Sequence, residues 1–296
     1  MRLGALEARG SKMICAVGTQ DGAIEKKQII PTRGPGETMD EVIGFFADSR
    51  IEALGIASFG PVDVHKSSAT YGYILDTPKE GWRHFDLLGT VRSALCVPVE
   101  LETDMNGACL GEMTFGIAKG LDSVVYVSIG TGIGAGVAVN GLLLHGMLHP
   151  EAGHMLLRRH PRDGYEGICP FHATCFEGLA SGPAIAERWG RPAETLIGDN
   201  KVWEMESHYI AQAMVNLILV MSPRIIILGG GVMKQEELFP MIRKRVKKIL
   251  NEYLNTAEMM DMDHYIVPAS LQGDQGILGC IELARRALMQ KNPVDR

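Results

Sequence analysis

Two cysteines and two histidines lie close together in the middle of the sequence: His154, Cys169, His172 and Cys175. Thiolate and imidazole are ligands that zinc favours, and four of them close a tetrahedral site without leaving a position for water. A closed site is structural, so the pattern predicts a structural Zn²⁺ that holds a long loop and takes no part in catalysis. The alternative is a pair of buried thiols beside two surface histidines, but the tight Cys-x2-His-x2-Cys spacing favours the metal.

Two carboxylates flank this predicted zinc loop. Glu151 stands three residues before His154, and Glu177 stands two residues after Cys175. A carboxylate that is held in a fixed position is a good acceptor for a neutral hydroxyl group. We therefore expect Glu151 and Glu177 to bind the hydroxyl groups of a small ligand.

A polar turn near the N-terminus is a candidate for phosphate binding. Glu7, Gly10, Ser11 and Lys12 lie between two predicted strands. A glycine-containing turn in that position can point backbone N–H groups and a hydroxyl at phosphate oxygens. Taken alone, however, the stretch favours an ordinary hairpin turn.

A second turn between two strands resembles the first. Residues 130–136 carry four alternate glycines and begin with Gly130, Thr131 and Gly132, which allows backbone to approach a ligand closely. No helix follows and no Gly-Lys-Ser/Thr is present, which excludes a dinucleotide fingerprint and a Walker loop. The pattern of residues 7–12 thus recurs about 120 residues later, which suggests a duplicated lobe with one phosphate-binding turn in each copy.

Two predicted strands end in residues that could face a cleft. One runs into Gly60 and Pro61, which place rigid backbone at its end. The other ends at Thr103 and Asp104, directly before helical spacing begins. Asp104 could act as a helix N-cap or as a general base, and by itself the cap is the favoured interpretation.

The predicted elements alternate between strands and helices, which indicates an α/β fold. We expect a lobe from residues 1–116, a second lobe from 117–274 that contains the zinc loop at 151–177, and a last helix at about 275–290 that packs back on the first lobe. Three glycines end a buried strand in the second lobe. Because ligands in open α/β sheets sit beyond the carboxyl ends of strands, Gly229, Gly230 and Gly231 are a candidate purine shelf.

Composition restricts the class of protein. Hydrophobic residues make up 46% and charged residues 22% of 296 residues, enough for a full core. The net charge of −6, without a long basic run, argues against a nucleic-acid partner, and residues 243–248 are expected to be a solvated helix face. No apolar stretch approaches the ~20 residues of a membrane span.

Cysteine usage suggests a reducing compartment. Besides the two predicted zinc ligands, the remaining cysteines lie in apolar segments and are expected to behave as small buried hydrophobes: Cys15, Cys96, Cys109 and Cys280. This pattern predicts a cytoplasmic protein.

Together these stretches resemble the ROK family of sugar kinases, in particular its bacterial ATP-dependent fructokinases. The resemblance covers nearly the whole chain, and the order and spacing of its motifs are more specific than any one of them. The resemblance implies the duplicated ribonuclease-H-like (actin-like ATPase/hexokinase) fold, with two lobes around a cleft. It also implies a homodimer. Repressors of the family carry a further DNA-binding domain, for which no room is expected before the turn at residue 7.

The family's roles transfer to matching positions of this sequence. Asp104 would be the general base that takes the proton from the attacking sugar hydroxyl, and Glu7 or Asp104 would hold Mg²⁺ through a water molecule. The other matching residues would contact the substrates. On the sugar side these are Gly60, Pro61, Thr103, Asp104, Glu151, His154 and Glu177, and on the ATP side Glu7, Gly10, Ser11, Lys12, Gly130, Thr131, Gly132, Pro183, Gly229, Gly230 and Gly231.

Two positions depart from the family pattern. Thr103 replaces an asparagine of the hexokinase-like members, which fits a preference for fructose over glucose. Arg9 replaces the first of two glycines in the phosphate turn. If that position needs a positive φ, arginine costs roughly 1–2 kcal/mol and would misplace the turn, or else its guanidinium could contact phosphate.

The first prediction is therefore phosphorylation of D-fructose to fructose 6-phosphate by ATP. Glucose, mannose and N-acetylmannosamine are rival acceptors within the same class. A second hypothesis is a sugar-sensing protein that has lost efficient transfer through Arg9. A third, a zinc hydrolase that uses His154 and Glu151, is disfavoured because four protein ligands leave no open position on the metal.

Overall fold

The computed structural model describes residues 1–291 and divides the chain into two compact units. Each unit is assembled from segments that are far apart in the sequence. The first comprises Met1–Gly120, His145–His149 and the chain from Ser270 onward, and the second comprises Leu121–Leu144 and Pro150–Ala269.

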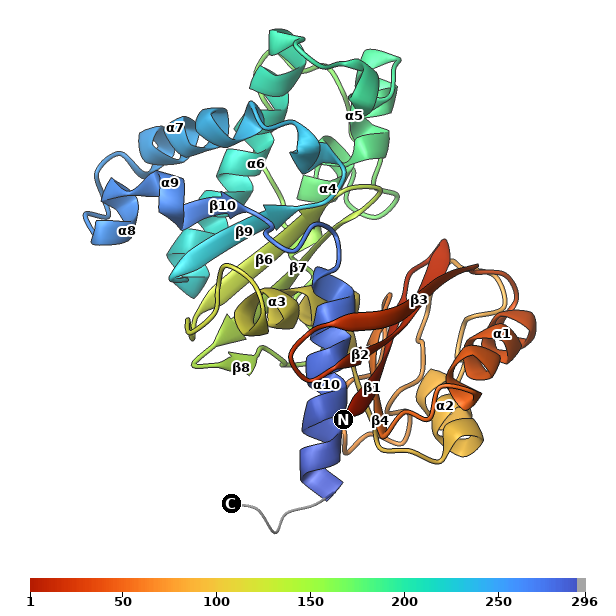
Figure 1. Cartoon of the computed structure of the whole chain (residues 1–296). Helices are drawn as coiled ribbons and strands as arrows, with labels where there is room; N and C mark the ends of the chain where they lie inside the picture. Colours follow the sequence, from red (N-terminus) through yellow and green to blue (C-terminus); the bar gives the residue numbers. More distant parts are fainter. Residues whose placement is uncertain (292–296) are drawn as a thin grey trace. The chain divides into compact units, whose positions relative to one another are not determined.

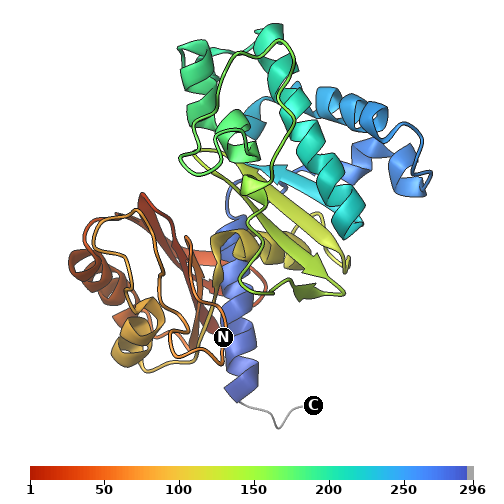
Figure 2. The same cartoon turned by 180° about the vertical axis from the view of Figure 1, so that it is seen from behind.

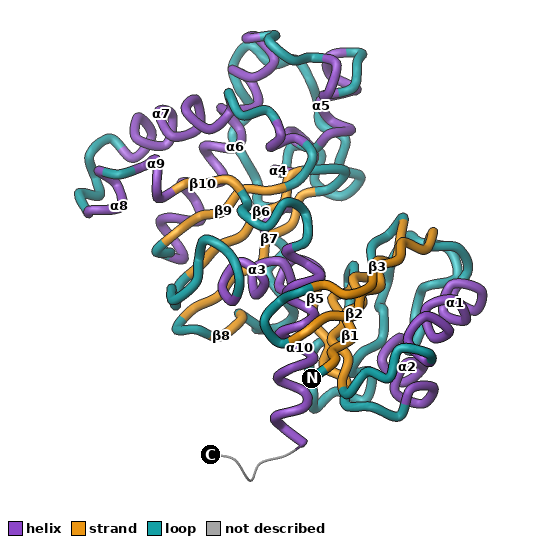
Figure 3. Tube along the Cα trace, in the orientation of Figure 1, coloured by secondary structure: helices purple, strands orange, loops and turns teal. Residues whose placement is uncertain are grey.

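The first unit contains a five-stranded sheet in the order β3-β2-β1-β4-β5. The hairpins β1–β2 and β2–β3 are antiparallel, whereas β1, β4 and β5 run parallel to one another. In Figure 3 these strands are orange. Their bounds are β1 (Arg2–Ala8), β2 (Lys12–Thr19), β3 (Ile24–Pro31), β4 (Ala53–Ser58) and β5 (Val99–Thr103).

Helices cover both faces of this sheet (Figure 1). Alternate residues of β1 point to opposite faces, so Leu6 joins one apolar cluster and Ala5 joins another. Helices α1 (Pro35–Ala47) and α2 (Leu87–Leu95) belong to the first cluster. Helix α10 (Gln275–Lys291) belongs to the second, and it packs against β1, β4 and α3 (Asp104–Thr114).

The second unit repeats the topology of the first. Its sheet has the order β8-β7-β6-β9-β10, again with two antiparallel hairpins followed by parallel strands. This equivalence supports the duplication that the two echoing turns suggested. The bounds are β6 (Val124–Ile129), β7 (Ile133–Val139), β8 (Leu142–Leu143), β9 (Ile225–Gly229) and β10 (Ile266–Pro268).

One core fills the second unit between its sheet and its helices, and α6 lies across one face of the sheet (Figure 2). Val125, Val127 and Ile129 project from β6 into this core. The helices are η1 (Ala152–His154), α4 (Phe176–Ala180), α5 (Gly182–Trp189), η2 (Ala193–Thr195), α6 (Asn200–Met221), η3 (Val232–Lys234), α7 (Leu238–Leu250), α8 (Ala257–Met260) and α9 (Met262–Tyr265).

Several expectations from the sequence need correction. Cys96 is exposed, because it is the left-handed C-cap of α2 and not part of a buried stripe. The basic stretch of α7 is only partly a solvated face: Arg243 donates to the carbonyl of Ile266, and Arg245 donates to Ser207. These long side chains reach polar groups of neighbouring elements that the periodicity of α7 does not reveal.

The glycine-rich turn is shorter than the sequence indicated. Strands β6 and β7 pair as far as Ile129 and Ile133, so only residues 130–132 form the turn, and Gly134 and Gly136 lie within β7. Within residues 1–291, no helix combines the length and the apolar character that a membrane crossing requires.

Candidate active site and metal centre

The first unit gathers its candidate residues at one edge of its sheet. Strands β1, β4 and β5 are parallel, and their registers align Ala8 with Ser58 and Ser58 with Thr103. The carboxyl ends of all three strands therefore meet at the same edge. The phosphate turn, Gly60 and Asp104 each follow directly after one of these ends, where ligands of α/β sheets bind.

The phosphate turn is a tight hairpin with Gly10 and Ser11 at its tip. The N–H of Arg9 donates to the carbonyl of Lys12 at 2.9 Å, and Thr32 Oγ1 donates to the carbonyl of Arg9 at 2.9 Å. The φ of Arg9 does not lie in the left-handed region. The expected strain at Arg9 is therefore wrong for this turn, since its backbone suits an L-residue.

Glu7 is a buried carboxylate beneath this turn, with only 3% of its surface exposed. Its Oε1 accepts from Arg9, at 2.8 Å from Nε and 2.6 Å from Nη2. Its carboxyl group also lies directly over Gly276 in α10, where an added Cβ would come within 2.2 Å of Oε1. Burial raises the pKa of Glu7, and Arg9 opposes that rise.

Asp104 is the first residue of α3. The side chain of Thr103, and not that of Asp104, caps the helix by accepting the N–H of Asn106 at 3.1 Å. The favoured interpretation of Asp104 as the cap is therefore wrong. Asp104 Oδ1 accepts the N–H of Met105 at 2.9 Å, while burial and then the negative charge of Glu7 raise the pKa of Asp104 to about 7.

Sequence reasoning missed a polar cluster beside Asp104. Glu102 accepts from Asn106 Nδ2 at 3.0 Å and lies 2.7 Å from Nε2 of His145. This hydrogen bond raises the pKa of His145. His145 begins the short segment His145–His149, which belongs to the first unit although the chain on either side of it belongs to the second. The available signal was an acidic residue inside an apolar strand, but nothing in the sequence indicated its partner.

The second unit gathers the glycines predicted to hold the nucleotide. Strands β6 and β9 are parallel and adjacent, so the turns that follow them lie at the same edge of the sheet. A Cβ on Gly130 would lie 3.7 Å from the N atom of Gly231. The N–H of Gly182 donates to the carbonyl of Gly130 at 2.7 Å, which places the start of α5, with Pro183, beside the same turn.

The four predicted metal ligands form one cluster, with all ligand atoms within 4.8 Å of one another. Nδ1 of His154 is 3.8 Å from the sulfur of Cys169 and 3.6 Å from that of Cys175, and Nδ1 of His172 is 3.7 Å from Cys169. Ligands of a tetrahedral zinc lie roughly 3.4–3.8 Å apart, given normal zinc–sulfur and zinc–nitrogen bonds. The donor set and its spacing therefore fit zinc.

Local structure prearranges this cluster. The sulfur of Cys175 caps α4 by accepting the N–H of Gly178 at 3.3 Å, and isolated bridges join Leu156 to Cys175 and Cys169 to Ala173. Burial raises the pKa of Cys175 to about 11, so the thiol needs a bound cation to become a thiolate.

The two candidate carboxylates lie on elements that touch one another. Glu151 precedes η1, and η1 packs against β7 and against α4, which carries Glu177. Gly153 permits this packing, because a Cβ there would come within 1.8 Å of the carbonyl oxygen of Ile133. Glu177 Oε2 accepts the N–H of Ile133 at 2.8 Å.

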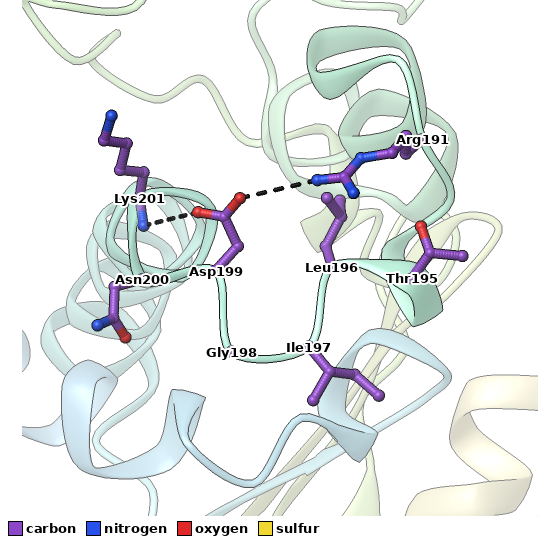
Figure 4. Close-up of a pocket in the computed structure, with 8 residues that line it drawn as sticks. All are labelled: Arg191, Thr195, Leu196, Ile197, Gly198, Asp199, Asn200 and Lys201. Atoms are coloured by element: carbon purple, nitrogen blue, oxygen red, sulfur yellow. Dashed lines mark hydrogen bonds and ion pairs between the residues drawn. The ribbon is translucent and has the colours of Figure 1, made fainter.

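A surface depression at the start of α6 lies apart from these residues (Figure 4). Asp199 accepts the backbone N–H of Lys201 at 3.2 Å and lies 3.8 Å from Arg191. Asp199 thereby caps α6, and the depression contains none of the predicted catalytic or ligand-binding residues.

Comparison with solved structures identifies the fold. The chain superimposes on the crystal structure of a ROK hexokinase from Thermus thermophilus with a TM-score of 0.80, 24% identity, and coverage of 98% of this chain and 100% of the other. The two units of like topology are thus the actin-like, two-lobed fold of these proteins, as predicted.

Sequence comparison gives the family. The profile of the ROK family matches residues 3–287. A Bacillus subtilis (strain 168) relative is 53% identical over 97% of this chain and 96% of its own, and a fructokinase of Pediococcus pentosaceus is 45% identical over 97% of this chain and 99% of its own. The chain belongs to the ROK family, which confirms the resemblance.

Proposed function

We propose that this chain is an ATP-dependent fructokinase that transfers the γ-phosphoryl group of ATP to D-fructose and forms fructose 6-phosphate. The observation that carries the proposal is the position of Asp104 at the sheet edge that also bears the phosphate turn. The Pediococcus pentosaceus relative, which matches over nearly its whole length, is a fructokinase and supports this acceptor.

Asp104 is proposed as the general base. Phosphoryl transfer needs an aligned nucleophile and stabilised phosphate charge more than covalent participation by the protein. A base works best when its pKa lies near the working pH, and burial beside Glu7 raises the pKa of Asp104 to about 7. As the first residue of α3, Asp104 is held by a helix and a strand at once.

The phosphate side is proposed to involve Glu7, Gly10, Ser11 and Lys12. Mg²⁺ prefers carboxylate and water oxygens, and Glu7 Oε2 is buried without a hydrogen-bond partner. That orphaned oxygen fits a metal-held water. Bound Mg²⁺ would neutralise phosphate charge, while the turn supplies backbone N–H groups to the phosphates.

The nucleotide is proposed to lie against the glycine turns of the second unit. Gly130, Thr131 and Gly132 form one turn, and Gly229, Gly230 and Gly231 follow the neighbouring strand. Thr131 and Gly132 are exposed and therefore accessible to a ligand. Pro183 would complete this surface at the start of α5.

The residues proposed for sugar binding offer carboxylate, imidazole, hydroxyl and backbone groups. Glu177 keeps Oε1 for a sugar hydroxyl, since Oε2 accepts from Ile133. The full proposed set is Gly60, Pro61, Thr103, Asp104, Glu151, His154 and Glu177. The zinc ion proposed at His154, Cys169, His172 and Cys175 is structural and fixes Glu151 and Glu177.

An acceptor panel tests this function. The chain is assayed with ATP and Mg²⁺ for ADP release with fructose, glucose, mannose and N-acetylmannosamine. We expect the highest kcat/KM for fructose. If another hexose gives the highest kcat/KM, that hexose is the acceptor. If no hexose leads to ADP release, the kinase assignment is rejected. The last result would favour a sugar sensor, although the unstrained backbone of Arg9 removes the reason given for lost transfer.

We also propose that the chain acts in the cytoplasm as a homodimer. ATP as donor supports an intracellular site of action. Two large exposed apolar side chains within the zinc loop, Leu156 and Phe171, support an interface between copies. Light scattering that gives the mass of one chain, 32.2 kDa, would reject the dimer.

A further inference from the structure

The pair of Glu7 and Arg9 has a feature that the proposed roles leave unexplained. Glu7 is buried and its Oε2 has no partner, yet Oε1 receives two N–H groups of the Arg9 guanidinium. Arg9 is much more accessible, with 37% of its side chain exposed. A buried carboxylate is therefore paired with a long, partly exposed side chain that reaches it from the phosphate turn.

Electrostatics explain why a cation is held there. A buried carboxylate is costly without a counter-charge, and burial is the largest cause that raises the pKa of Glu7. Lys27 and Asp274 also act on Glu7, but these two residues pair with each other. Arg9 is the cation that both contacts Glu7 and counteracts its burial.

Two kinds of cation can balance the single negative charge of Glu7. Arg9 contacts Oε1 while Oε2 has no partner, so the two cations compete for the charge of the carboxylate and not for one oxygen atom. A guanidinium binds a carboxylate through its N–H donors. A divalent ion such as Mg²⁺, with its shell of water, needs the same negative charge. A guanidinium that leaves Glu7 needs new acceptors, and the phosphate oxygens proposed to bind at the tip of the turn, Gly10 and Ser11, would supply them.

We propose that Arg9 is a resident counter-ion of Glu7 that competes with divalent cations for this carboxylate and transfers to nucleotide phosphates when ATP binds. The inference rests on the proposed function, because it places ATP at this turn. It makes two predictions. First, divalent cations should bind weakly to the protein without nucleotide. Second, ATP binding should depend less on a divalent cation in the wild type than in a variant that lacks the Arg9 guanidinium.

Metal binding without nucleotide tests the first half. The zinc-loaded chain is titrated with Mn²⁺, and free Mn²⁺ is followed by electron paramagnetic resonance. We expect Arg9→Gly to bind Mn²⁺ about tenfold more tightly than the wild type, which is the order expected from losing one charge-assisted pair. The gain should disappear in the double variant Arg9→Gly/Glu7→Gln. Equal Mn²⁺ affinity in wild type and Arg9→Gly would overturn the competition.

Nucleotide binding without metal tests the second half. The affinity for a fluorescent ATP analogue is measured in excess EDTA after zinc loading and rapid transfer, with zinc content checked at the end. We expect Arg9→Gly to bind about tenfold more weakly than the wild type and Arg9→Lys to fall between them. Equal affinities would overturn the transfer to phosphate.

Controls separate these outcomes from other failures. Arg83→Gly removes an exposed arginine that pairs with exposed Asp76, and it should change neither affinity. Circular dichroism verifies folding, and Arg9→Lys supplies a variant that keeps the charge if Arg9→Gly does not fold. Neither assay uses sugar, so a chain that phosphorylates no hexose still gives a clear result for Arg9.

Discussion

Oε2 of Glu177 accepts the backbone N–H of Ile133 at 2.8 Å. Glu177 stands in α4, whose N-cap is the predicted metal ligand Cys175, and Ile133 directly follows the glycine turn that is proposed to hold ATP. One carboxylate thus links the metal centre to the nucleotide turn within the second unit. Loss of the metal should therefore weaken the binding of ATP as well as that of the sugar.

Removal of a metal ligand tests this link. Cys175→Ser should abolish zinc content and raise KM for fructose and for ATP, each by about tenfold or more, because groups that orient a metal site typically have effects of this size. Elemental analysis and steady-state kinetics measure both. Cys96→Ser is the matched control, since Cys96 is exposed and lies outside the cluster. Unchanged kinetics in a zinc-free Cys175→Ser protein would contradict the link.

Substitution of Glu177 separates its two proposed tasks. Glu177→Gln keeps an oxygen that can accept the Ile133 N–H but loses the charge offered to the sugar, so KM for fructose should rise with little change in KM for ATP. Glu177→Ala loses the hydrogen bond as well, and KM for ATP should rise about fivefold or more. Equal KM values for ATP in the two variants would show that the bond to Ile133 does not support the nucleotide turn.

The acidity of Asp104 predicts the pH dependence of catalysis. A general base must be deprotonated, so kcat/KM should fall as pH decreases through about 7 and should be constant above it. Glu7→Gln removes the neighbouring negative charge that raises this pKa, and the midpoint should move to lower pH. A pH–rate profile of each protein measures the midpoint. A wild-type profile that is flat from pH 5 to 8 would exclude Asp104 as the titrating base.

The same pKa makes Asp104 a cost to stability. Its folded-state pKa of about 7 exceeds the ordinary value of 3.8, so the folded chain holds a proton that the unfolded chain releases, and stability is lost as pH rises from about 4 to 7. Asp104→Asn should therefore raise Tm by a few degrees at pH 8 and have little effect at pH 4. Thermal unfolding at both pH values checks this, and an equal effect at the two would contradict it.

The sequence predicted those strands and ligand clusters whose residues are close together along the chain. The buried apolar runs of β1, β2, β6 and β9 and the cysteine–histidine spacing all depend on residues that are close in the sequence. The family resemblance was confirmed by a family profile that matches residues 3–287.

Other features depend on residues that meet only in the folded chain. The guanidinium of Arg9 meets Glu7 two residues away, but Gly276 reaches the same carboxylate from the far end of the sequence. His145 meets Glu102 for the same reason. The role of Asp104 as a cap was wrong because Thr103, one residue earlier, was equally able to cap and has the required extended backbone.

The most direct test of the central claim, that Asp104 activates a fructose hydroxyl toward ATP, is phosphorus-31 NMR of the reaction with fructose, ATP and Mg²⁺ at pH 8. The wild type should convert the γ-phosphate signal into that of fructose 6-phosphate. Asp104→Asn, at the same concentration and with ATP still bound, should do so at least about 100-fold more slowly. Formation of fructose 6-phosphate at equal rates by the two proteins would contradict the account.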